Sequence, residues 1–150
     1  MTAIEKIKIL LNQAEIKAEE SLTIGQENSL RERNLREFKK LYEKLEISKN
    51  HLDFSTIFHY KSINLAGIGL KKEDFGEIRE GKYVQIISIA YVLNNEGKEV
   101  LKNASLGYYG KAEKLSEEKK SEIIEFVLRW RYEKSFQQSD YYEELLHKLH

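Results

Sequence analysis

The pattern of apolar and polar side chains over residues 83–109 predicts two long antiparallel strands. Residues 83–93 are apolar at almost every position, which is typical of a strand covered on both faces in the middle of a sheet. In the next segment Val100 and Leu106 alternate with polar residues, so one face of that strand is expected to meet water. Residues 94–97 read Asn-Asn-Glu-Gly and favour a tight reversal, because asparagine and glycine adopt positive φ readily.

Apolar residues spaced three and four apart predict two helices within residues 1–48. Ile4 and Ile7 mark the buried side of the first helix. The second is expected to begin at Ser29, because Glu32 follows it at the spacing of a capping box. We expect the two helices to pack against each other as an antiparallel hairpin.

The apolar spacing changes to alternation over residues 52–110 and predicts an antiparallel meander of about four strands. Residues 54–60 alternate as one strand, and residues 63–70 are expected to form a second, short strand that bends at its glycines. The two strands of residues 83–109 complete the predicted sheet.

Helical spacing returns over residues 116–149 and predicts two C-terminal helices. Ser116 stands before two glutamates and suits an N-cap. Asp140 and Glu143 repeat the capping spacing and are expected to open the final helix. The order of helices, sheet and helices predicts one α+β domain over residues 1–150.

Composition limits the classes of function. The chain has 150 residues and 41% hydrophobic content, enough for one domain with a core. Its 25 basic and 25 acidic residues cancel, so no global field draws nucleic acid or a membrane surface to it. There is no cysteine, and the charged N-terminal stretch does not resemble a signal peptide. We expect a cytoplasmic protein that does not bind membranes, and the zero net charge disfavours nucleic acid as a partner.

The sequence contains no convincing catalytic or metal-binding motif. It has neither a cysteine nucleophile nor a Gly-x-Ser-x-Gly elbow. His51, Asp53 and His59 are the nearest approach to a metal-ligand set, but His51 precedes the expected strand that carries the other two. Histidines that face solvent or bond to the protein are the favoured interpretation. We expect no enzymatic activity, no metal and no cofactor.

Cations and aromatic residues alternate near the C-terminus. The candidate partner-binding residues are Arg129, Trp130, Arg131, Tyr132, Phe136 and Tyr141. These residue types dominate protein-binding hot spots, and they also stack on bases and bind phosphates. Three interpretations stay open: packing of the aromatic rings in the core, a protein interface, and a nucleotide or nucleic-acid site.

Our first functional hypothesis is a non-enzymatic protein-binding module that self-associates. Size and composition suggest a small phage or mobile-element inhibitor that occludes a bacterial protein. The alternative is a protein that binds an anionic nucleotide at an oligomer interface, with Arg129 or Arg131 on the phosphate and a tyrosine on the base. Under the first hypothesis, Trp130→Ala is expected to weaken partner capture and leave the protein folded.

Overall fold

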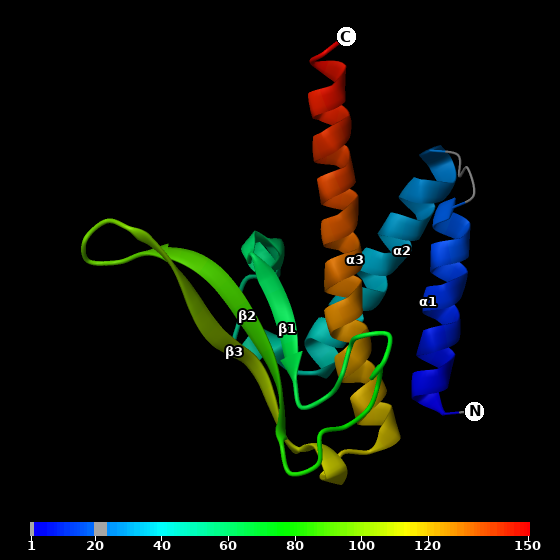
Figure 1. Ribbon diagram of the computed structural model, residues 1–150, viewed down its shortest axis with the longest axis vertical. Coiled ribbons are helices and arrows are strands. Elements are labelled where there is room, and N and C mark those ends of the chain that lie inside the picture. The colour runs from blue at the N-terminus through cyan, green and yellow to red at the C-terminus, as the bar shows by residue number, and fades with distance from the viewer. Residues whose placement is uncertain (1, 20–23) are drawn as a thin grey trace.

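The computed structural model describes residues 2–19 and 24–150 and has an α+β architecture (Figure 1). Helices from both ends of the chain flank an antiparallel sheet, which confirms the predicted class. The helices are α1 (Ala3–Glu19), α2 (Ile24–Lys44) and α3 (Glu117–His147), and the strands are β1 (Ser62–Ala66), β2 (Tyr83–Leu93) and β3 (Glu99–Lys111). The described sheet has three strands in the order β1-β2-β3, so the prediction of four is wrong.

The missing strand is the segment Phe54–His59, which forms a 3₁₀ helix instead of the predicted strand. Asp53 caps this helix, and its carboxylate accepts hydrogen bonds from the backbone N–H and the hydroxyl of Ser55, at 3.1 and 2.7 Å. Such local bonds offer the backbone an alternative to a sheet ladder. The turn buries Ile57 completely. Alternating apolar residues therefore do not distinguish a strand from a short 3₁₀ helix here, because the helix also directs a side chain into the core.

The strand β2 and its reversal lie where the sequence predicts them. The backbone N–H of Asn94 donates to the carbonyl of Lys98 over 2.8 Å, and Gly97 has a φ of 75°. The prediction that both faces of β2 are covered is wrong. Val84 and Ile86 are buried at the base of the strand, whereas Leu93 at its far end is 74% exposed. The helices cover only one face of the sheet, and β2 continues beyond them (Figure 1).

Two predicted helix boundaries are wrong. Helix α2 begins at Ile24, so Ser29 lies inside it and does not cap it. Helix α3 runs through Asp140 without a break, so the two predicted C-terminal helices are one. Neither glycine nor proline interrupts this region, and Asp140 forms an ion pair with Arg31. Ser116 does cap α3, as predicted, and accepts the backbone N–H of Lys119 over 3.1 Å.

Helix α3 is the common partner of the other layers. Both α1 and α2 pack on it, and β1 approaches it from the other side. In Figure 1 α2 crosses behind α3. In the part of the chain that the structure describes, both N-terminal helices contact α3, and the turn of the predicted hairpin lies outside the described residues.

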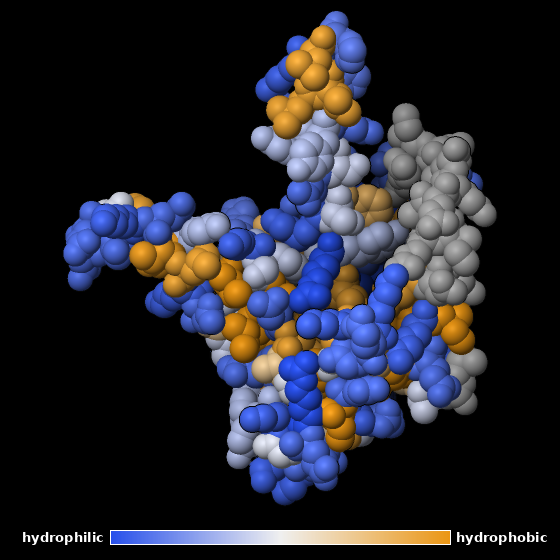
Figure 2. Space-filling view, in the orientation of Figure 1, coloured by the Kyte–Doolittle hydropathy of each residue, from blue (hydrophilic) through white to orange (hydrophobic). Residues whose placement is uncertain are grey.

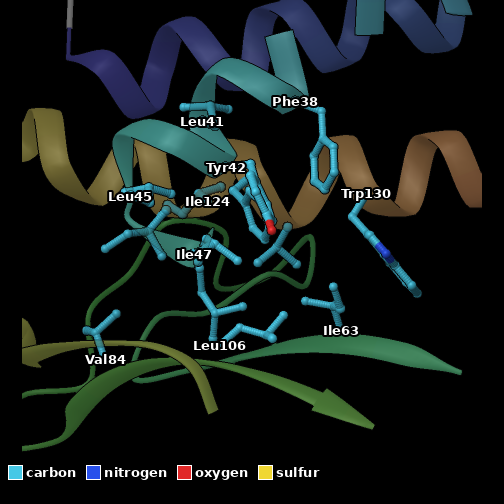
Figure 3. Packing of buried hydrophobic residues seen from close by; sticks show 14 of the residues in the cluster. Phe38, Leu41, Tyr42, Leu45, Ile47, Ile63, Val84, Leu106, Ile124 and Trp130 are labelled. Carbon is cyan, nitrogen blue, oxygen red and sulfur yellow. The ribbon is translucent and has the colours of Figure 1, made fainter. Parts of the chain in front are cut away.

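The core lies between α2, α3 and the inner face of the sheet (Figure 3). Phe38 of α2 stacks on Phe126 of α3, with ring centroids 4.7 Å apart. The sheet contributes Ile63, Ile86 and Leu106, which are at most 1% exposed. Burying each such side chain stabilises the fold by about 1.5–3 kcal/mol. Of the helices in the described part of the chain, none combines the length and apolar character that crossing a membrane requires.

Candidate interaction site

Two segments project from the body of the molecule (Figure 1). The first is the far part of the β2–β3 hairpin, residues 90–102, which we call the hairpin arm. The second is the end of α3, residues 139–149, which we call the helix arm. The two arms extend in different directions from a shared base, and almost all of their residues are exposed.

The hairpin arm presents apolar side chains on both of its faces. Tyr91 and Leu101 lie directly opposite each other across the two strands and are each 52% exposed. Val100 is exposed on the other face, where it lies opposite Val92. Exposed apolar side chains that are contiguous, not scattered, mark interaction surfaces.

The helix arm carries an apolar seam. Its exposed members are Tyr142, Leu145, Leu146 and Leu149, spaced by three and four residues along one side of α3. Leu146 is 57% exposed and Leu149 is 77% exposed. In Figure 2 hydrophobic residues gather at the free end of α3 and along the hairpin. This spacing is the pattern by which a helix packs against another protein element, and no described residue covers it.

Trp130, the first residue expected at a partner interface, lies in the core. It is 3% exposed, and its indole N–H donates to the carbonyl of Ile57 over 2.8 Å. Its ring also stacks with Phe58, at a centroid distance of 6.3 Å. Trp130 is therefore not available to a partner, and Trp130→Ala is expected to disturb the fold itself.

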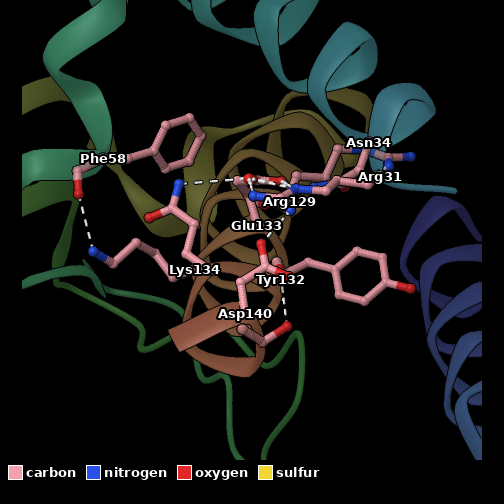
Figure 4. A network of polar contacts seen from close by, with 10 residues as sticks. Arg31, Asn34, Phe58, Arg129, Tyr132, Glu133, Lys134 and Asp140 are labelled. Atoms are coloured by element: carbon pink, nitrogen blue, oxygen red, sulfur yellow. Dashed lines mark hydrogen bonds and ion pairs between the residues drawn. The ribbon is translucent and has the colours of Figure 1, made fainter. Parts of the chain in front are cut away.

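The arginines on either side of Trp130 hold α3 to its neighbours. Arg129 contacts Glu125 over 2.9 Å and the side-chain oxygen of Asn34 over 3.0 Å (Figure 4). Arg131 donates to the carbonyl of Ile63 over 3.1 Å, and burial lowers its pKa. Both guanidinium groups already have protein acceptors, which leaves fewer donors for the phosphate suggested by the sequence.

The remaining candidates divide between the body and the helix arm. Tyr132 and Phe136 are half-buried and stack on each other with centroids 4.8 Å apart, and burial raises the pKa of Tyr132. The guanidinium of Arg31 lies 5.7 Å from the centre of the Phe136 ring. Tyr141 is 56% exposed and lies on the helix arm. Tyr141 is the most exposed of the four aromatic candidate residues.

A charged network fixes the base of the helix arm (Figure 4). Arg31 of α2 donates to the buried carboxylate of Glu133 over 2.7 Å and to Asp140 over 2.6 Å. Its hydrogen bond to Glu133 is the main cause of its raised pKa. This network ends where the helix arm begins, so it holds the last anchored turn of α3 in place.

A basic groove lies between the two arms. It has a volume of about 470 Å³. Its lining residues come from the 3₁₀ helix, β2 and α3: His51, Thr56, His59, Tyr60, Lys61, Ala90, Tyr91 and Lys134. Half of these side chains are lysine or histidine and none is acidic, although the chain as a whole has no net charge. The two lysines therefore make the groove locally positive.

The hydrogen bonds around His51 determine its tautomer. Its Nε2 lies 2.9 Å from the hydroxyl of Thr56, and its Nδ1 lies 2.9 Å from the hydroxyl of Tyr60. The Thr56 hydroxyl donates its only hydrogen to the carbonyl of Asp53, so it must accept from Nε2. Neutral His51 consequently carries its proton on Nε2, and Tyr60 donates to Nδ1. Both ring nitrogens are engaged, which argues against His51 as a metal ligand.

Asp53 and His59, the other two candidate metal ligands, are exposed. Asp53 is a cap, and the hydrogen bond from the Ser55 hydroxyl is the main cause of its lowered pKa. Across the part of the chain that the structure describes, no three histidine, aspartate or glutamate side chains form a group that could hold a metal ion.

The two lysines of the groove have defined positions. The Lys61 ammonium lies 5.1 Å from the centre of the Tyr91 ring. Lys134 donates to the carbonyl of Phe58 over 2.9 Å and lies above the ring of Trp130. An ammonium has three donors, so each lysine can still bond to an anion. Sequence reasoning missed the groove because Lys61 and Lys134 are distant in the chain and no motif links them.

Comparison with known proteins identifies no relative of this chain. No family model matches the chain, and neither a curated protein nor a solved structure is similar to it. The two arms and the basic groove between them are the features of the chain that bear on its function.

Proposed function

We propose that this chain is a non-enzymatic protein-binding module whose contact surface is formed by the hairpin arm and the helix arm. The observation that carries the proposal is the exposed apolar seam of the helix arm, which includes Leu146 and Leu149. Each such leucine that a partner covers contributes about 1.5–3 kcal/mol of burial free energy. In the free chain these side chains remain in water and contribute no burial free energy to the stability of the fold.

The arrangement of the arms supports a partner that contacts both. They rise from a common base, where the Arg31 network anchors α3 and the sheet anchors the hairpin. Aromatic anchors are present on each arm, Tyr91 on the hairpin and Tyr142 on the helix. Such residues dominate binding energy at protein interfaces. The size and composition of the chain are consistent with a phage or mobile-element inhibitor that occludes a bacterial protein.

Partner capture with matched variants tests this function. Tagged protein carrying Leu146→Ser or Leu93→Ser is compared with Leu10→Ser, which removes a leucine of α1 that is 54% exposed, close to the 57% of Leu146. We expect the two arm variants to lose a captured partner that the wild-type chain and Leu10→Ser retain. Equal capture by all four proteins would refute the arms as the contact surface.

A second candidate function is the binding of a small anionic ligand in the basic groove. It is favoured by the two lysines and by Tyr91, whose ring could stack on a base. It replaces the nucleotide site expected at Arg129 or Arg131, since those guanidinium groups bond within the protein. Thermal unfolding in the presence of nucleotides checks it, because a ligand that binds the folded state raises the unfolding temperature.

A further inference from the structure

Strand β2 is longer than the strand that pairs with it on one side. Strand β1 pairs with β2 only from Ser62, opposite Ile89, to Ala66, opposite Gln85. The Lys61 N–H adds one more bond, to the carbonyl of Ile89 over 2.8 Å. Beyond Ile89, β2 continues to Leu93 and pairs only with β3. The hairpin arm therefore has an open edge that begins next to the groove.

The alternation of backbone groups identifies which residues face this open edge. In a strand, the N–H and C=O of successive residues point to opposite sides in the plane of the sheet. Asn94 bonds toward β3 and Ile89 bonds toward β1, so even-numbered residues face β3 and odd-numbered residues face β1. Tyr91 and Leu93 are odd-numbered like Ile89, so they face the same side of β2. Their backbone groups consequently point to the open edge, and no described strand lies opposite them there.

The charges beside this edge favour one kind of occupant. Tyr91 lines the basic groove, and the ammonium of Lys61 lies over its ring. Lys134 and His59 lie in the same groove, and no lining side chain carries a carboxylate. A second copy of the chain is a poor occupant, because pairing two such edges would bring their basic groups together. A strand that carries acidic side chains matches both the edge and the charge.

We propose that the open edge of β2 binds an extended, acidic segment of the partner protein. The segment pairs through its backbone with Tyr91 and Leu93 and directs a carboxylate into the groove toward Lys61 and Lys134. Exposed sheet edges accept added strands in this way, with main-chain bonds for affinity and side-chain contacts for specificity. This inference rests on the proposed protein-binding function and adds the chemistry of the partner segment.

The test uses the full chain and a short fluorescent peptide of alternating glutamate and valine, with binding measured by fluorescence anisotropy. Leu93→Pro removes the N–H at the open edge and leaves the pairing with β3 in place. Asn103→Pro is the matched control, because Asn103 lies opposite Ile89, outside the hairpin arm, and its N–H faces the outer edge of β3. Lys61→Glu reverses one charge of the groove. Thermal unfolding verifies that each variant is folded.

We expect Leu93→Pro and Lys61→Glu to weaken peptide binding by about tenfold or more, and Asn103→Pro by less than about twofold. A peptide with lysine in place of glutamate, or one N-methylated at alternate residues, is expected not to bind. The N-methylated peptide tests backbone pairing even if Leu93→Pro does not fold.

Several results would overturn the inference. Failure of the acidic peptide to bind the wild-type chain is one, and equal effects of Leu93→Pro and Asn103→Pro are another. Displacement of the peptide by ATP or inorganic phosphate, with binding unchanged in Leu93→Pro, would assign the groove to small anions. If the peptide fails while arm-dependent capture persists, only this inference falls, whereas loss of arm dependence defeats the proposed function itself.

Discussion

The indole N–H of Trp130 donates to the carbonyl oxygen of Ile57 over 2.8 Å, joining α3 to the 3₁₀ helix that precedes the sheet. The aromatic residues of α3 differ in burial along the helix. Phe126 and Trp130 are buried, Tyr132 and Phe136 are half-buried, and Tyr141 and Tyr142 are exposed. The proposed binding role belongs to the exposed residues at the end of the helix.

Removal of the Trp130 side chain is expected to destabilise the fold. Trp130→Ala leaves a cavity and should cost about 3–5 kcal/mol of unfolding free energy. Trp130→Phe keeps a ring but leaves the Ile57 carbonyl without its donor, at a cost of about 1–3 kcal/mol. Urea denaturation measures both values. Capture of the partner by folded Trp130→Phe should equal that of the wild type, and a selective loss of capture would place Trp130 in the interface after all.

Loss of the Arg31 guanidinium should leave a buried carboxylate without its main partner. The Glu133 side chain is 3% exposed, and Arg31 is 29% exposed. We expect Arg31→Ala to cost about 2–3 kcal/mol, below the range for a fully buried pair because water reaches the arginine. The control is Lys40→Ala, which breaks an exposed ion pair with Glu37 and should cost under about 0.5 kcal/mol. Equal effects in chemical denaturation would show that Glu133 has other adequate partners.

Stability should fall in alkaline solution because of Tyr109. Burial raises the pKa of Tyr109, whose hydroxyl donates to the carbonyl of Leu45 over 3.1 Å. An unfolded tyrosine ionises near pH 10. Below that pH both states are neutral at this group, and its contribution is constant. Above it the unfolded state ionises while folded Tyr109 keeps its proton, so the unfolding free energy decreases as pH rises.

Phenylalanine variants measure this effect. Tyr109→Phe should flatten the decline above about pH 10, and urea titrations at several pH values record the slope. The decline should persist in part, because burial also raises the pKa of Tyr42. Tyr108→Phe is the neighbouring control, since Tyr108 is 60% exposed. If Tyr108→Phe and Tyr109→Phe alter the slope equally, the assignment to Tyr109 is wrong.

The helix arm should cause self-association when no partner is present. Two copies can cover each other's seam, which includes Tyr142 and Leu146. Light scattering over a range of concentrations should show the mass of the wild-type chain rising above that of a monomer. The double variant Tyr142→Ser, Leu146→Ser should remain monomeric, and Leu10→Ser should behave as the wild type. A wild-type chain that is monomeric throughout would refute self-association and leave partner binding in place.

The sequence predicted the elements whose signals are local. The apolar run of residues 83–93 and the Asn-Asn-Glu-Gly reversal predicted β2 and its turn, and Ser116 marked the start of α3. Two other local signals led to wrong predictions. Asp53 caps a 3₁₀ helix through short-range bonds to Ser55, where alternation predicted a strand. Asp140 lies inside α3 and pairs with Arg31 of α2, where the capping spacing predicted the start of a new helix.

The candidate site was less predictable than the fold. Composition identified a C-terminal concentration of aromatic residues, but it could not separate buried Trp130 from exposed Tyr141. Which turns of α3 extend past the body depends on the lengths of α2 and the sheet. The groove is assembled from Lys61, Tyr91 and Lys134, which come together only after β1 and α3 pack. No spacing in the sequence encodes that contact.

Hydrogen–deuterium exchange of the captured complex, compared with the free chain, tests the central claim most directly. We predict slower exchange in the hairpin arm, residues 90–102, and in the helix arm, residues 139–149. Residues 117–127, on the anchored part of α3, should be unchanged. Protection confined to α1 or to the anchored part of α3, with both arms exchanging as in the free chain, would contradict the account.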